Sequence, residues 1–126
     1  MREILVGAAV AVLLTSCSEE QAQVEMTDAN RFEPDSIEVS ANEQIVFSNL
    51  GDAAHTVTAY QDSIPEGGDY FSSGEFETEL QARDHIAEAL IAPRQEFTIT
   101  LEEPGTYRYF CIPHESQGMT GRLVVR

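Results

Sequence analysis

The chain has 126 residues, of which 42% are apolar, and its formal net charge at pH 7 is −15. This length accommodates one domain, and the apolar content is that of a globular protein rather than a disordered one. Twenty-two acidic residues face seven arginines and no lysine, which excludes nucleic acid and anionic membrane surfaces as electrostatic partners and favours a basic partner.

Residues 1–16 read as a signal peptide rather than as part of the fold. Ile4 to Leu14 form an apolar run of eleven residues, too short to span a bilayer as a helix but typical of a signal-peptide core. The run leads into Thr15-Ser16-Cys17, which looks like the lipobox of a bacterial-type lipoprotein. We therefore expect cleavage before Cys17, lipidation of Cys17 and a polar tether over residues 17–23. An ordinary secretory signal that happens to contain a cysteine is the alternative.

Residues 24–126 form the predicted domain, in which short segments of alternating hydrophobicity are separated by turn residues. Such a series indicates an all-β sandwich of about seven to eight strands. The predicted strands are residues 24–27, 36–39, 44–49, 55–60, 96–101, 106–110 and 121–125. Residues 30–34 read as a turn-rich link between the first two strands.

A loop and a helix, together residues 62–92, interrupt the strands. Glycine and proline make residues 62–74 a loop, and residues 77–90 predict a helix of about three to four turns that Pro93 ends. We expect this excursion to lie across an edge of the sandwich, with His85 exposed to solvent. The residues expected to form its inward stripe are Phe76, Leu80, Ala87 and Ile91.

The most specific motif lies near the C-terminus, where Cys111, His114 and Met119 follow the spacing C-x2-H-x4-M. A thiolate, an imidazole and a weak axial thioether are ligands of a blue-copper centre, which needs a second histidine. His55, at the start of a predicted strand, is the candidate. If Cys17 carries lipid, Cys111 has no disulfide partner, and metal binding explains a lone thiol in an oxidising compartment. A disulfide between the two cysteines is the alternative.

The copper motif and its flanks, residues 107–114 and 118–125, strongly resemble plastocyanin and pseudoazurin-like cupredoxins, and residues 32–39 and 45–49 look like the opening strands of that family. The resemblance covers most of residues 24–126. It implies a cupredoxin-like Greek-key β-sandwich that holds one copper ion, Cu(I) or Cu(II). The ligands that it implies are His55, Cys111, His114 and Met119.

One departure from the family concerns Thr56. Plastocyanins usually have asparagine after the first histidine ligand, where it braces the ligand loop, and the shorter Thr56 leaves that bracing open. Three aromatic residues precede the motif cysteine. We expect Tyr107 to be a structural tyrosine at a Greek-key corner, and Tyr109 and Phe110 to belong to the core.

Three functions fit these residues. The leading hypothesis is an extracytoplasmic, periplasmic or cell-surface electron carrier, a lipid-anchored monomer that exchanges single electrons with redox proteins, basic or membrane-bound. The alternative is a copper storage or delivery module, but such sites expose clusters of Met and His, and this chain has three Met in all. A redox enzyme is disfavoured because catalysis needs a vacant coordination position.

Overall fold

The computed structural model describes residues 21–126, so Cys17 and the expected signal peptide lie outside the described residues. The described chain has eight strands and a few short helices. The strands are β1 (Ala22–Met26), β2 (Phe32–Glu33), β3 (Ser36–Val39), β4 (Gln44–Asn49), β5 (Thr58–Ala59), β6 (Glu96–Thr100), β7 (Gly105–Phe110) and β8 (Thr120–Val125). The helices are the 3₁₀ helices η1 (Gln61–Ser63) and η2 (Ile112–Gln117) and the α-helices α1 (Glu79–Asp84) and α2 (Ile86–Ala89).

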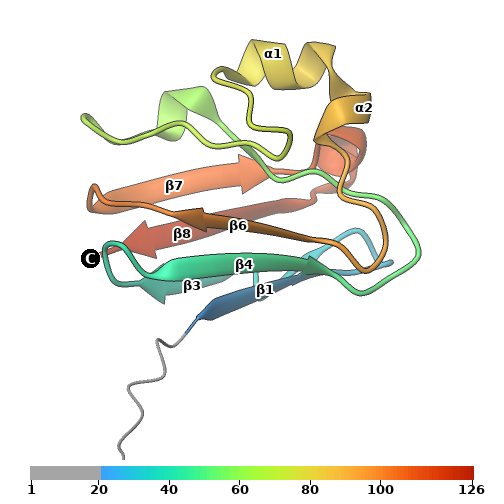
Figure 1. Cartoon of the computed structure of the whole chain (residues 1–126), viewed down its shortest axis with the longest axis horizontal. Helices are drawn as coiled ribbons and strands as arrows, with labels where there is room; N and C mark the ends of the chain where they lie inside the picture. The colour runs from blue at the N-terminus through green and yellow to red at the C-terminus, as the bar shows by residue number, and fades with distance from the viewer. Residues whose placement is uncertain (1–20) are drawn as a thin grey trace, which may run out of the picture.

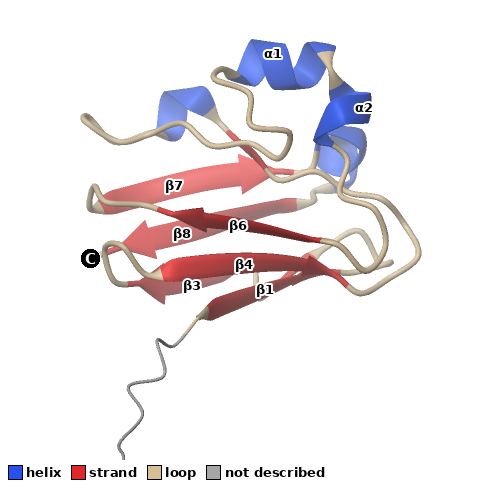
Figure 2. Ribbon diagram, in the orientation of Figure 1, coloured by secondary structure: helices blue, strands red, loops and turns tan. Residues whose placement is uncertain are grey.

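The strands form two four-stranded sheets, ordered β2-β1-β4-β6 and β3-β8-β7-β5, which lie as two layers in Figure 1. Each sheet contains one parallel pair, β1 with β4 and β3 with β8, and its other neighbours are antiparallel. The expected all-β sandwich is confirmed. The helices gather beside one edge and one end of it, as Figure 2 shows.

Alternating side chains of the two sheets meet in a common apolar core. Tyr109 of β7 packs edge-on against Phe32 of β2, with ring centroids 4.7 Å apart, and against Phe47 of β4 at 5.3 Å. All three rings are almost completely buried. Tyr107 is also buried and donates a hydrogen bond from its hydroxyl to the carbonyl of Glu103, 2.7 Å away, as expected of a corner tyrosine.

The predicted helix over residues 77–90 is wrong in its continuity. The chain forms two short helices, α1 and α2, because His85 between them leaves the helical region at φ −129° and ψ 48°. The predicted inward stripe is also partly wrong, since Leu80 is 68% exposed and Ala87 is exposed as well. The helical residues that pack inward are instead the small Ala82 and Ala89. His85 is exposed, as predicted.

Two strand predictions also need correction. Residues 55–60 contain only the two-residue strand β5, and His55 instead makes an isolated bridge with Ile91. The turn-rich link at residues 30–34 contains the short strand β2, which pairs with β1. The alternation over residues 55–60 therefore overstates the length of β5, whereas the two-residue β2 is too short to produce any alternation in the sequence. Within residues 21–126, no helix has the length and apolar character needed to cross a membrane.

Replacing Phe47 by alanine is expected to lower the free energy of unfolding by ~3–5 kcal/mol, because it leaves a cavity among buried aromatic rings. Urea denaturation measures the change. Leu50→Ala is the control, because Leu50 is 65% exposed and its truncation should change stability by less than ~0.5 kcal/mol. Equal losses for the two variants would contradict this description of the core.

Candidate metal centre

The four candidate ligands come from loops at one end of the sandwich, at the right in Figure 1. His55 follows the loop after β4, Cys111 directly follows β7, His114 lies in η2, and Met119 directly precedes β8. Because β7 and β8 are antiparallel neighbours, the loop that joins them begins and ends at the same place. The backbone N–H of Cys111 accordingly donates to the carbonyl of Met119, 3.0 Å away.

Three of these side chains converge on one point. The Cys111 Sγ atom lies 3.3 Å from His114 Nδ1 and 3.7 Å from His55 Nδ1, and the two Nδ1 atoms are 3.3 Å apart. The structure thus brings together residues that are up to 59 positions apart in the sequence. Met119 is buried at the end of the same loop, and its backbone N–H donates to the carbonyl of His114.

Burial favours the neutral forms of two of the converging groups, His55 and Cys111. His55 and Cys111 are fully buried, whereas His114 is half-buried. Burial lowers the pKa of His55, and the neighbouring His114 lowers it further, so His55 offers a free lone pair at neutral pH. Burial also raises the pKa of the Cys111 thiol, although the N–H of Thr56 opposes this effect. A bound cation would stabilise the thiolate.

The donor atoms fit a metal ion in both spacing and chemistry. A triangle with sides of 3.3, 3.3 and 3.7 Å has a circumscribed radius of about 2.0 Å, which matches the bonds of about 2.0–2.1 Å that a first-row ion such as zinc makes to nitrogen and is a little shorter than the bond of about 2.3 Å to sulfur. Three lone-pair donors facing one another at these distances repel unless a proton or a cation lies between them. Two imidazoles, a thiolate and a nearby thioether are the donor set that suits copper.

Thr56 connects the two segments that carry the converging donors. Its backbone N–H donates to Cys111 Sγ at 3.3 Å, and its hydroxyl accepts from the N–H of Ile112 at 2.8 Å. The same hydroxyl lies 3.1 Å from that of Thr58. Thr56 therefore braces the ligand loop by hydrogen bonds to the side chain of Cys111 and to the backbone of Ile112. The threonine side chain, although shorter than asparagine, is long enough to make this contact.

Two residues that the sequence did not single out fix the loop before His55. Asn49, fully buried at the end of β4, donates from Nδ2 to the carbonyls of Ala53 (2.7 Å) and Ile91 (2.9 Å). Asp28 accepts at Oδ1 from the backbone N–H groups of residues 52 and 53. The signal for Asn49 was weak, a polar residue at the end of a strand whose centre, residues 45–47, is apolar, and nothing local marked Asp28.

Thr56→Val is expected to lower the free energy of unfolding of the copper-free protein by ~1–3 kcal/mol, because valine keeps the shape but leaves the N–H of Ile112 without its acceptor. Thr56→Ser, which keeps the hydroxyl, should lose less than half as much. Denaturant titration of both variants provides the measurement. If serine and valine destabilised the protein equally, the hydroxyl would not be what braces the loop.

A known protein family matches most of the chain. The model of the family "Copper binding proteins, plastocyanin/azurin family" matches residues 18–126. The plastocyanin of Ginkgo biloba is 37% identical over 94 residues, covering 75% of this chain and 86% of that protein.

Solved structures of plastocyanin and pseudoazurin have a similar fold. The plastocyanin of Dryopteris crassirhizoma superposes with a TM-score of 0.59 at 29% identity, covering 83% of this chain and all of that one. A Sinorhizobium pseudoazurin gives a TM-score of 0.60 at 28% identity over 84% of this chain and 73% of that one. The chain belongs to the plastocyanin/azurin family of copper-binding proteins.

Proposed function

We propose that this plastocyanin-like blue copper protein is a one-electron carrier whose single copper ion is held by His55, Cys111, His114 and Met119. The observation that carries the proposal is the convergence of three donor atoms, all within 4.8 Å of one another, at a site built from loops that are far apart in the sequence. The family supplies the identity of the ion, and the donor set agrees with it.

The residues around the site favour electron transfer because they hold the donors in place. When bound, copper supplies a one-electron Cu(I)/Cu(II) couple, for which thiolate and thioether suit the reduced ion and imidazole suits both states. The β7–β8 loop and the hydrogen bonds of Thr56 fix the backbone on both sides of Cys111. A fixed donor arrangement changes little between two oxidation states, so little reorganisation accompanies electron transfer.

A storage or delivery role finds less support in the described residues. Such a role favours an exposed cluster of Met and His side chains, but both described methionines, Met26 and Met119, are buried. The exposed His85 stacks on Phe76, and its Nδ1 atom lies 2.8 Å from the carbonyl oxygen of Gln81, so this nitrogen already has a partner within the protein. A catalytic role would need a vacant coordination position, which a set of four protein donors does not leave.

The proposal extends to location and partners. We place the protein outside the cytoplasm, anchored by lipid on Cys17. This location follows from the signal-peptide and lipobox patterns of the sequence and suits a redox carrier. His114 is the half-buried member of the converging trio, so a redox partner approaches the centre most closely on its side. With a net charge of −15, the protein would steer towards a basic partner through long-range attraction.

Cys111→Ser should abolish the intense visible band that thiolate-bound copper produces, because the hydroxyl does not replace the soft thiolate donor. The measurement is an absorption spectrum after titration with Cu(II), together with a test for a reversible one-electron couple in the unmodified protein. His85→Ala is the matched control and should keep the full band, since His85 lies on the insertion away from the converging donors. Retention of colour in Cys111→Ser would refute the ligand set. A colourless, readily exchanging Cu(I) site in the unmodified protein would favour storage.

A further inference from the structure

The geometry points to Arg83, on the insertion helix α1, as a positioning residue for the metal-binding loop: it holds His114 in place through Glu115. This inference rests on the proposed function, because it assigns a role to a residue that touches neither the donors nor the ion. It gives the insertion between β5 and β6 a purpose that its sequence did not reveal.

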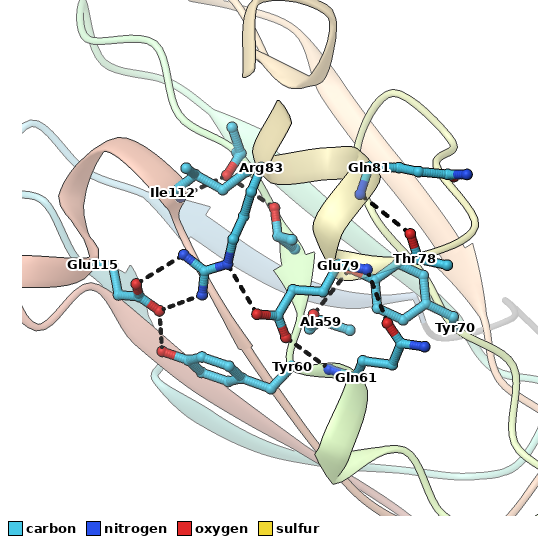
Figure 3. A network of polar contacts seen from close by, with 12 residues as sticks. Ala59, Tyr60, Gln61, Tyr70, Thr78, Glu79, Gln81, Arg83, Ile112 and Glu115 are labelled. Carbon is cyan, nitrogen blue, oxygen red and sulfur yellow. Dashed lines mark hydrogen bonds and ion pairs between the residues drawn. The ribbon is translucent and has the colours of Figure 1, made fainter. Parts of the chain in front are cut away.

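The first observation is a bidentate ion pair, called the fork below, between Arg83 and Glu115, the residue that follows His114. Arg83 Nη1 and Nη2 donate to the two carboxylate oxygens of Glu115, each at 3.0 Å, and the Tyr60 hydroxyl donates to Glu115 Oε2 at 2.7 Å. Figure 3 shows the Glu115 carboxylate joined to both the Arg83 guanidinium and the Tyr60 hydroxyl. Bidentate, charge-assisted hydrogen bonds fix orientation as well as distance, so they restrict the backbone of η2 where His114 projects from it.

The second observation is that the same guanidinium also covers the residue before Cys111. Its Cζ atom lies 4.3 Å from the centroid of the Phe110 ring, a cation–π distance, and Tyr60 stacks on Phe110 with centroids 4.3 Å apart. Arg83 therefore contacts the chain immediately before one candidate ligand and immediately after another.

The third observation is that Arg83 is itself held in place. Its Nε donates to Glu79 Oε2 at 2.9 Å, one helical turn earlier. Glu79 and Gln61 of η1 exchange hydrogen bonds in both directions, since each side chain accepts from the other's backbone N–H. The start of α1 is thus tied to the chain that leaves β5, and the helix has a fixed position from which to hold the loop.

The protonation states agree with this geometry. The Arg83 guanidinium lowers the pKa of Glu115, which is therefore ionised at neutral pH. Burial, with the hydrogen bond to Glu115, raises the pKa of Tyr60 to about 12, so its hydroxyl stays a donor.

Exposure separates this ion pair from an ordinary surface pair. The side chains of Arg83 and Glu115 are 34% and 32% exposed, whereas those of Arg126 and Glu38, a second bidentate pair, are 69% and 61% exposed. Exposed pairs contribute little to stability because water and salt screen them. The Arg126 pair lies at the C-terminus, at the opposite end of the sandwich from the metal site (Figure 1), so it offers a control with the same change of charge.

The test begins with the copper-free protein, in which hydrogen exchange is measured at the amides of His114, Gly118 and Met119. These amides donate to carbonyls within the loop or at its start. Arg83→Gln should raise their exchange rates about tenfold, because the loop loses a contact that resists local opening, and should leave the amides of β7 unchanged. Arg126→Gln removes the same charge and should leave all of these rates unchanged. Equal rates in the two variants would overturn the proposal.

Two further variants test the fork itself. Glu115→Gln should raise the same exchange rates, and adding Arg83→Gln to it should add little, because the two residues act as a unit. Arg83→Lys keeps the charge but cannot form a planar fork, so it should restore the rates only in part. Full restoration by lysine would overturn the bidentate role.

The copper-loaded protein then separates positioning from mere structural support. Arg83→Gln should shift the visible absorption band and the reduction potential, and Arg126→Gln should shift neither. Faster exchange with an unchanged band and potential would reduce Arg83 to a structural residue and overturn the proposal. If the unmodified protein showed no blue band at all, the proposed function would fail, while the exchange measurement would still decide whether Arg83 orders the loop.

Discussion

The mutual approach of three lone-pair donors is the constraint on which the rest of this structure depends. His55 Nδ1, His114 Nδ1 and Cys111 Sγ lie 3.3 to 3.7 Å apart, an arrangement whose lone pairs repel one another unless a proton or a cation lies between them. The scaffold must therefore hold these three atoms close together. The β7–β8 pairing, the hydrogen bonds of Thr56 and the buried amide of Asn49 do so from three directions.

Much of this arrangement could be predicted from the sequence, for identifiable reasons. The β-sandwich was predictable because seven segments alternate clearly, and the Cys111–Met119 loop because its donor types and spacing rarely coincide. The elements that sequence reasoning missed depend on distant contacts. β2 has two residues and owes its existence to pairing with β1. The break at His85 divides a segment whose composition alone favours one helix.

The insertion illustrates a second limit of prediction. Nothing in the local sequence distinguishes Arg83 from a surface arginine, so the sequence gives no sign that this segment has a role at the metal site. Its partner Glu115 lies 32 positions later, on the far side of two strands. Only the folded chain shows that the helix rests against the metal-binding loop. The contact between Arg83 of α1 and Glu115 of η2 becomes visible only in the three-dimensional structure, because neither residue stands out in the sequence.

The direction of β1 has a consequence for how an anchored molecule would stand at a membrane. β1 runs parallel to β4, and the loop after β4 leads to His55, so the described chain begins at the end of the sandwich opposite the metal site. The proposed lipid on Cys17 would then be attached to the chain at the end of the sandwich that lies away from the metal site, because only residues 18–21 separate Cys17 from β1. In that arrangement, redox partners would reach the metal site from the aqueous compartment and not from within the plane of the membrane.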